Sequence, residues 1–202
     1  MAEPLVNEQD FIANALRGDL DAFNALVILH QDTVYSLTFR IMGEAESAAD
    51  ATQEAFISAY RRLETYRGGS FRAWLLRIAT NTCYDELRRR KRRPATPMEE
   101  LPGGESDDGP PLPDQSDTPE DIVQQDELRR VIEACIKALQ DDQRMVIVLS
   151  DVEGLSYQEI AEAVGAQLGT VKSRLSRARM GVRRCLQGFK ELLPASYRLN
   201  DE

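Results

Sequence analysis

The stretch that decides the fold runs from Glu153 to Leu186 and reads EGLSYQEIAEAVGAQLGTVKSRLSRARMGVRRCL. Ser156 with Glu159 three residues later predicts a capping box at the start of a short helix, and Gly165 can end that helix in the left-handed conformation. Gly169 and the residue after it then open a second helix. The expected buried stripe of this second helix consists of Val171, Leu175, Ala178 and Val182. Two short helices joined by a turn that contains glycine indicate a helix-turn-helix, which places its second helix in the major groove of DNA.

The charge on the second helix supports this interpretation. From Val171 to Lys190 the chain has seven Lys or Arg residues and no acid, although its formal net charge is −9. Charge of one sign on a helix that follows a cap and a turn favours DNA binding. The alternative is a basic amphipathic helix that only forms a solvated face or lies on a membrane surface.

The negative charge of the chain is concentrated in one segment. Positions 1–93 hold 13 acids and 13 bases, positions 94–127 hold 11 acids and no base, and positions 128–202 hold 10 acids and 12 bases. Positions 94–118 are rich in proline, glycine and serine and poor in apolar residues, so they cannot bury enough surface to fold. We therefore expect two domains joined by a flexible acidic linker. This linker either competes with DNA for the basic surfaces beside it or is only a soluble spacer.

Composition argues against several classes of protein. The chain of 202 residues is 42% apolar, no run approaches 18 apolar residues, and the N-terminal segment lacks the basic and apolar parts of a signal peptide. We therefore expect a cytoplasmic protein without membrane insertion. The three cysteines, Cys83, Cys135 and Cys185, lie about 50 residues apart without a CxxC motif, and His30 is the only histidine. This pattern predicts neither a disulfide framework nor a metal or cofactor site, and we expect each cysteine and His30 to be buried in a core.

Helical periodicity accounts for the N-terminal half. The first 20 residues predict at most a short helix that ends at Gly18, and a longer helix then runs to Gly43. Ser47 with Asp50 suggests another capping box at the start of the next helix, and a further helix starts at Phe71.

The C-terminal half reads as a second helical domain. Thr118 and Pro119 suit the N-cap and first position of a helix, and apolar spacing predicts further helices around 128–139 and from about Asp142 to Asp151. Together with the helix-turn-helix these segments form a four-helix unit. No segment has the two-residue period of a strand, so the predicted fold class is all-α.

One face of the helix after Ser47 carries unusual polar residues. Asp50, Gln53, Glu54 and Ile57 lie at i, i+3, i+4 and i+7, so two acids, an amide and an aliphatic tip share one outward face. Such a face suits a protein partner, and the alternative is a solvated face whose first-turn acid is favoured by the helix dipole.

The helix from Phe71 carries a second functional stripe. Arg77, Asn81, Tyr84 and Arg88 follow one line, which runs into the six consecutive bases Arg88 to Arg93. Aromatic rings and guanidinium planes stack on unstacked bases, and an amide can read a base edge, so this line suits melted nucleic acid. The alternative is a solvated helix with a basic C-terminal end.

Three motifs, in this order, resemble known sequence signatures. Residues 50–56, DATQEAF, resemble the DxxQE[AV]F signature of sigma region 2, and residues 71–92, FRAWLLRIATNTCYDELRRRKR, resemble the following segment, which melts and reads the minus-ten element. Residues 155–179, LSYQEIAEAVGAQLGTVKSRLSRAR, resemble sigma region 4. Most of the chain is thus similar to the extracytoplasmic-function, or group IV, sigma factors of bacterial RNA polymerase, and to their sigma-E-like members in particular.

The resemblance implies a role for each surface. It implies that Asp50, Gln53, Glu54 and Ile57 dock on the coiled coil of the polymerase β′ clamp. It implies that Arg77, Asn81, Tyr84 and Arg88 bind the minus-ten element, and that Arg88 to Arg93 contact its backbone. It implies that Lys172, Ser173, Arg174, Ser176 and Arg177 bind the minus-thirty-five element.

The resemblance also implies a domain plan and a set of partners. Residues 1–93 form the region 2 domain, 94–118 a disordered linker, 119–193 the region 4 domain and 194–202 a C-terminal tail. The partners are core RNA polymerase, through its β′ clamp and β flap, promoter DNA and an anti-sigma factor. The protein would be a promoter-specificity subunit, used in stress responses, with no catalysis of its own and no cofactor.

Two other functions compete with this interpretation. A helix-turn-helix regulator that binds duplex DNA without polymerase would carry a ligand pocket or a dimer surface in its N-terminal part. A recombinase or nuclease would need a catalytic cluster, but the chain has one histidine and no three acids at spacings that gather on one metal.

Overall fold

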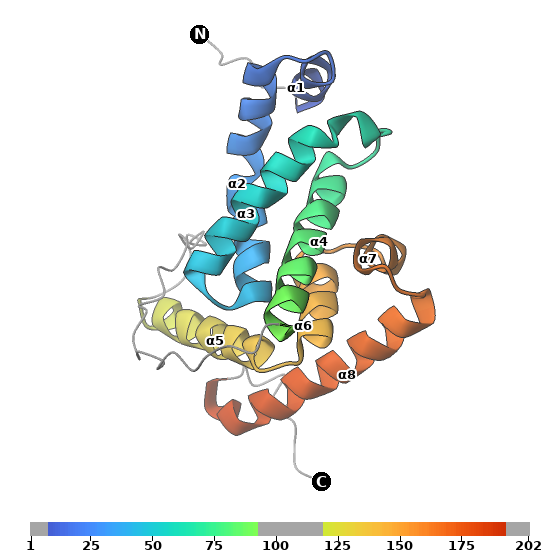
Figure 1. Ribbon diagram of the computed structural model, residues 1–202. Coiled ribbons are helices and arrows are strands. Elements are labelled where there is room, and N and C mark those ends of the chain that lie inside the picture. The colour runs from blue at the N-terminus through green and yellow to red at the C-terminus, as the bar shows by residue number, and fades with distance from the viewer. Residues whose placement is uncertain (1–7, 93–118, 193–202) are drawn as a thin grey trace.

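The protein consists of two helical modules that lie against each other (Figure 1). The computed structural model describes residues 8–92 and 119–192. Within these ranges every regular element is helical, as the sequence predicts. The predicted linker at 94–118 and the predicted tail at 194–202 lie outside the described residues.

In the N-terminal module three long helices pack against one another, and a short helix packs on the first of them. Asp19 caps the first long helix, because its Oδ1 accepts hydrogen bonds from the backbone N–H groups of Asp21 and Ala22 at 2.9 and 3.1 Å. Gly43 ends that helix with φ at 75°. His30 is buried, as predicted, and its Nε2 lies 2.8 Å from Oε1 of Glu8. The helices are α1 (Glu8–Ala15), α2 (Leu20–Met42), α3 (Ala45–Arg61) and α4 (Phe71–Arg92), with a 3-10 turn η1 (Leu63–Thr65) before α4.

The start of α3 differs from the prediction. The helix begins at Ala45, after Glu44 as its N-cap, and not at a capping box of Ser47 and Asp50. Ser47 instead lies inside the first turn and donates its hydroxyl to Oε2 of Glu44 at 2.7 Å. The left-handed Gly43 turns the chain so early that the helix forms two residues before the serine, which then stabilises the N-cap carboxylate.

Helix α4 supplies a large share of the N-terminal core, together with α2. It starts after Ser70, whose Oγ accepts a hydrogen bond from the backbone N–H of Ala73 at 3.1 Å. Its core-facing residues Phe71, Trp74, Leu75, Ile78 and Ala79 are buried, whereas Thr82 is only half-buried. Phe71 and Trp74 also contact Tyr66, with ring centroids 5.5 and 5.7 Å away.

The C-terminal module confirms the helix-turn-helix. Ser156 Oγ accepts from the backbone N–H of Glu159, whose carboxylate accepts from the backbone N–H of Ser156 at 2.8 Å, so the predicted capping box is present. Gly165 ends this helix with φ at 61°, and the next helix begins at Leu168, one residue before the predicted Gly169. The elements are α5 (Pro119–Lys137), α6 (Asp141–Ile147), a π-helical segment η2 (Val148–Val152), α7 (Tyr157–Val164), α8 (Leu168–Leu186) and a 3-10 segment η3 (Gln187–Leu192).

The two modules share an interface that the sequence does not reveal. Helix α4 packs along α7, and α2 contacts α5, α6 and η2, so that one apolar core runs through both modules. The guanidinium of Arg144 in α6 donates to the carbonyl oxygen of Ile41 at the end of α2, at 2.9 Å. Arg72 of α4 donates to the backbone carbonyl of Glu153 at 3.0 Å and also pairs with the Glu153 carboxylate.

The expectation of three free cysteines is wrong for two of them. Cys135 of α5 and Cys185 of α8 form a disulfide across a sequence separation of 50 residues. Only Cys83 is a free, buried thiol among the described residues, and burial raises its pKa to about 12. The prediction fails because a spacing without a motif gives no sign that α5 packs beside the end of α8.

Candidate polymerase and DNA interfaces

Helix α3 separates its residues cleanly into a buried and an exposed side. Ala51, Ala55 and Ala59 are at most 4% exposed, whereas Asp50 and Glu54 on the opposite side are exposed. The other two members of the predicted docking face, Gln53 and Ile57, are exposed too. Within the described residues the Asp50 carboxylate has no hydrogen-bond or ion-pair partner, and Glu54 accepts only one long hydrogen bond, 3.4 Å from Ser58 Oγ.

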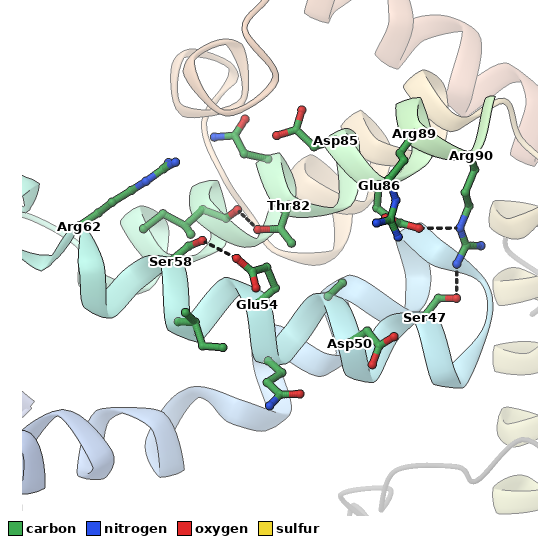
Figure 2. Close-up of a pocket in the computed structure, with 15 residues that line it drawn as sticks. Ser47, Asp50, Glu54, Ser58, Arg62, Thr82, Asp85, Glu86, Arg89 and Arg90 are labelled. Carbon is green, nitrogen blue, oxygen red and sulfur yellow. Dashed lines mark hydrogen bonds and ion pairs between the residues drawn. The ribbon is translucent and has the colours of Figure 1, made fainter. Parts of the chain in front are cut away.

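This face borders a groove between α3 and α4 that has a volume of about 780 Å³ (Figure 2). Arg90 of α4 crosses the groove to Ser47 at the start of α3, and its Nε also lies 3.1 Å from Glu86 Oε1. Burial alone would raise the pKa of Glu86, but the hydrogen bonds from Arg89 and Arg90 outweigh it and lower that pKa. Internal ion pairs and hydrogen bonds therefore bridge the groove near Ser47, whereas Asp50 and Glu54, which also line it, form no ion pair within the described residues.

The predicted minus-ten residues do not share one solvent-facing line. Arg77 and Asn81 line a smaller cavity of about 330 Å³ between α4 and α7, where Arg77 Nη1 lies 3.7 Å from Glu162 Oε2. Tyr84 is half-buried and packs against the core, and the Arg88 guanidinium lies over its ring, 5.5 Å from the centroid. Arg77 and Asn81 are thus half-buried beside α7, and Arg88 is exposed above the half-buried Tyr84.

Trp74 belongs to the core, but it also borders this cavity. It is 8% exposed and lines the same cavity as Arg77 and Asn81. Its indole Nε1 is buried and has no hydrogen-bond partner among the described residues. A buried N–H group without a partner is uncommon, so the signal for a functional role comes from the structure and not from the sequence pattern.

The basic run at the end of α4 is partly neutralised. Arg89 and Arg90 pair with Glu86, and Lys91 Nζ lies 2.8 Å from Oδ2 of Asp141 in the other module. The hydrogen bond that Lys91 donates to Asp141 raises the pKa of Lys91. Arg92 is exposed, and position 93 lies outside the described residues.

Helix α8 presents its predicted DNA-reading residues unequally. Four of the five are exposed on its N-terminal half, namely Lys172, Ser173, Ser176 and Arg177. Arg174 is half-buried, because its Nε lies 3.1 Å from Oδ2 of Asp142 in α6. Farther along, Arg179 donates two hydrogen bonds to Asp151, which lower the pKa of that carboxyl. Arg183 and Arg184 are exposed.

Two other kinds of site, a metal site and a membrane-spanning helix, are absent from the described residues. No cluster of histidine, cysteine, aspartate or glutamate in 8–92 and 119–192 is arranged to hold a metal ion. None of the helices in these ranges is both long and apolar enough to cross a membrane.

Two helical modules, one with a polar docking helix and the other ending in a helix-turn-helix, are the arrangement of a sigma-70-type protein. Comparison with protein families supports this class. Residues 26–93 match Sigma-70 region 2, and residues 129–180 match Sigma-70 region 4.

Comparison with individual proteins narrows the sigma-70 class to one group of sigma factors. The chain is 39% identical over 184 residues to the ECF RNA polymerase sigma-E factor of Escherichia coli K12, an alignment that covers 90% of this chain and 95% of the relative. It is 38% identical over 173 residues to the ECF RNA polymerase sigma factor SigE of Mycolicibacterium smegmatis, covering 86% of this chain and 65% of that relative's length. The sigma factor RpoE from Bartonella quintana, solved in complex with the anti-sigma factor NepR, shares the fold with a TM-score of 0.61 at 23% identity, over 83% of this chain and 98% of that one.

The chain belongs to the extracytoplasmic-function RNA polymerase sigma factors. It is a sigma factor that binds core RNA polymerase and directs promoter-specific initiation of transcription, with a DNA-binding region 4. The alternative of a regulator that acts without polymerase is not favoured.

Proposed function

We propose that the exposed face of α3 is the surface that docks on core polymerase, at the coiled coil of the β′ clamp. The observation that carries this proposal is that Asp50 and Glu54, which line the α3–α4 groove, are exposed and nearly without internal partners. The fold does not use these carboxylates, although neighbouring acids such as Glu44 and Glu86 are bound by arginine. Acids that the fold leaves unpaired beside an aliphatic tip at Ile57 suit a basic and apolar partner surface.

We propose further that the minus-ten element binds on α4 through Arg77, Asn81, Tyr84 and Arg88. The cavity beside Arg77 and Asn81 contains a cation, an amide and the buried edge of Trp74, which together can hold a flipped base by stacking and by hydrogen bonds. Arg88 on the ring of Tyr84 forms a second stacking platform at the solvent.

The minus-thirty-five element is proposed to bind the N-terminal half of α8. Lys172, Ser173, Ser176 and Arg177 are exposed there, and side chains at the start of a recognition helix meet base edges in the major groove. Arg174 can join them only by leaving Asp142, so we expect it to exchange one ion pair for a base contact.

Both elements cannot be bound in the arrangement of Figure 1. The names of the two elements place them about 25 base pairs apart, which is about 85 Å of B-form DNA. Here Arg77 on the minus-ten helix is paired with Glu162 of the helix-turn-helix. The 26 residues at 93–118 can span at most about 90 Å when fully extended, which is enough to let the modules separate on a promoter. We therefore propose that the compact arrangement is the DNA-free form.

The remaining proposals concern the setting of this activity. We propose that 1–93 and 119–193 act as the region 2 and region 4 domains, joined by 94–118, and that 194–202 is a tail. The protein acts in the cytoplasm, has no catalytic activity of its own, and is restrained by an anti-sigma factor. The last point is supported by the Bartonella quintana sigma factor, which shares this fold and was solved in complex with an anti-sigma factor.

The docking proposal is tested by reversing the two free carboxylates. The variant Asp50→Arg with Glu54→Arg is expected to lose co-elution with core polymerase while its helix content by circular dichroism stays unchanged, because exposed residues cost little to replace. The matched control reverses two exposed acids away from the groove, Asp32→Arg with Glu64→Arg, and is expected to co-elute as the parent does. Equal co-elution of both variants, or unfolding of the first, would refute the docking face.

A further inference from the structure

The disulfide of this protein joins the first helix of the DNA-binding module to the end of its recognition helix. Cys135 on α5 and Cys185 near the end of α8 have Cα atoms 5.7 Å apart, so the bridge joins the first helix of the module to the last. The sequence separation of 50 residues encloses α6, η2, α7 and nearly all of α8. Opening or closing this one bond therefore changes how the recognition helix is held.

The two halves of α8 are held by different contacts. Val171, Leu175 and Ala178 are at most 2% exposed and seat the N-terminal half between α6 and α7. None of the residues after Ala178, about two turns of helix, is fully buried. This second half is held by the disulfide to α5, by the two hydrogen bonds from Arg179 to Asp151, and by a close contact just after α5, where a Cβ added at Gly181 would come within 2.7 Å of Leu139 Cδ2.

The residues beside Cys185 are suited to contact DNA phosphates. Arg183 and Arg184 immediately precede it and are both exposed, on a helix whose earlier residues face base edges. A disulfide next to them fixes the backbone from which their side chains extend. Without it, the last turns of α8 keep the small contact at Gly181, the half-buried Val182 and, at their first residue, the exposed pair of Arg179 with Asp151.

The third cysteine behaves differently. Cys83 is fully buried in the N-terminal module, and burial raises the pKa of its thiol to about 12, so it holds almost no reactive thiolate at neutral pH. Cys185 is only half-buried, so its side of the bridge is open to solvent. Of the three cysteines, only Cys135 and Cys185 form a disulfide, and this disulfide is accessible from the side of Cys185.

We propose that Cys135 and Cys185 form a reversible redox switch that sets how firmly the C-terminal half of α8 is ordered for DNA binding. The proposal rests on the cytoplasmic location proposed above, because thiols there are kept reduced and a cytosolic disulfide usually serves as a transient sensor. In the reduced state the last turns of α8 are loosely held. In the oxidised state they are fixed on α5, and Arg183 and Arg184 are presented to the DNA backbone.

The chemistry balances with a peroxide as oxidant. One cysteine thiolate attacks a peroxide oxygen, the O–O bond breaks, and a sulfenic acid forms with the release of hydroxide, which takes up a proton to become water. The second thiol attacks the sulfenic sulfur, forms the S–S bond and releases a second water. A dithiol reductant reverses the step, because its thiolate attacks the disulfide and it leaves as a disulfide itself.

The test uses the full chain in two redox states. Protein treated with a dithiol and protein treated with hydrogen peroxide are each alkylated, and mass spectrometry counts the free thiols. Binding to a random-sequence DNA duplex is measured by fluorescence anisotropy at several salt concentrations, since phosphate contacts do not depend on sequence. The oxidised form should bind roughly tenfold more tightly at low salt, with a salt slope steeper by about one to two, as expected for two additional phosphate contacts.

Two variants make the result specific. Cys135→Ser with Cys185→Ser should bind like the reduced parent in both redox states, whereas Cys83→Ala should keep the full response. Two outcomes would overturn the proposal: equal binding by the reduced and oxidised parent, or free thiols at positions 135 and 185 after peroxide treatment. Co-elution with core polymerase, measured on the same samples, keeps the two claims apart. If the chain binds polymerase but shows no redox response, only the switch is wrong, and if it fails to bind polymerase in either state, the docking proposal is wrong.

Discussion

The ion pair between Arg72 and Glu153 offers a quantitative test of the interface between the two modules. The Glu153 side chain is 6% exposed, while that of Arg72 is 41% exposed. Arg72→Ala removes two hydrogen bonds from a residue whose carboxylate stays buried. Breaking a fully buried pair in this way costs about 3–5 kcal/mol, but water can replace part of a half-exposed arginine and Arg40 still attracts the carboxylate, so we expect a loss of about 2 kcal/mol.

Glu153→Gln is the informative partner variant. Burial raises the pKa of Glu153 by more than Arg72 and Arg40 lower it, which means that the charged carboxylate is less favourable in the closed structure than a neutral group. An amide keeps an acceptor for Arg72 and removes the buried charge. We therefore expect Glu153→Gln to be as stable as the parent at pH 7, or slightly more stable.

The single tryptophan provides an intrinsic fluorescence probe for this measurement. Trp74 is the only tryptophan, is 8% exposed, and lines the cavity between α4 and α7. Urea titrations that follow Trp74 fluorescence and far-ultraviolet circular dichroism together would measure the free energy of opening this interface and of unfolding. If Glu153→Gln is destabilised as much as Arg72→Ala, the balance between burial and attraction is wrong.

The same pair predicts a pH dependence. Because the pKa of Glu153 is raised in the closed form above its ordinary value of 4.5, closing the interface takes up protons. This contribution to stability is fully present below about pH 4.5 and is lost as the pH rises through the raised pKa. Glu153→Gln should lack this component, so the difference in stability between parent and variant should shift in favour of the variant as the pH rises through that window.

Three further predictions concern DNA binding. Arg174→Ala should weaken binding to a minus-thirty-five duplex by about 1–3 kcal/mol and relax preference at one base pair, whereas Arg183→Ala should weaken binding to all sequences alike, and equal loss of specificity would contradict the assignment. Since Arg174 is paired with Asp142, Asp142→Asn should free it and strengthen DNA binding, which a fluorescence titration would detect. Replacing the acids at 99–117 by serine and asparagine at constant length should tighten DNA binding by the free protein most at low salt, and no gain at low ionic strength would mean that the segment is only a tether.

Local signals in the sequence predict the helices of this protein well. The capping box of Ser156 and Glu159 and the left-handed stops at Gly43 and Gly165 are all present, because each depends on residues only a few positions apart. The one wrong cap, at Ser47, shows the limit of such signals. A serine three residues before an acid is compatible with two helix starts, and the turn at Gly43 selects the earlier one.

Contacts between distant segments could not be predicted in this way. The helical periodicity of α4 places Arg77 and Asn81 on its polar side. Only the fold shows that they line a cavity beside α7 and that Glu162 of α7 pairs with Arg77. The disulfide of Cys135 and Cys185 depends equally on how α5 packs beside α8. The exposed face of α3, by contrast, could be predicted, because the spacing of Asp50, Gln53, Glu54 and Ile57 alone places them on one side of a helix.

The central claim is that this chain tells core RNA polymerase where to begin transcription. The most direct measurement combines purified core polymerase with the full chain on a library of random DNA templates and sequences the 5′ ends of the transcripts. The account predicts start sites that appear only when the chain is added and that share two motifs with centres about 25 base pairs apart, since the two modules read separate elements. Identical start sites with and without the chain, or sites that share no paired motif, would contradict it.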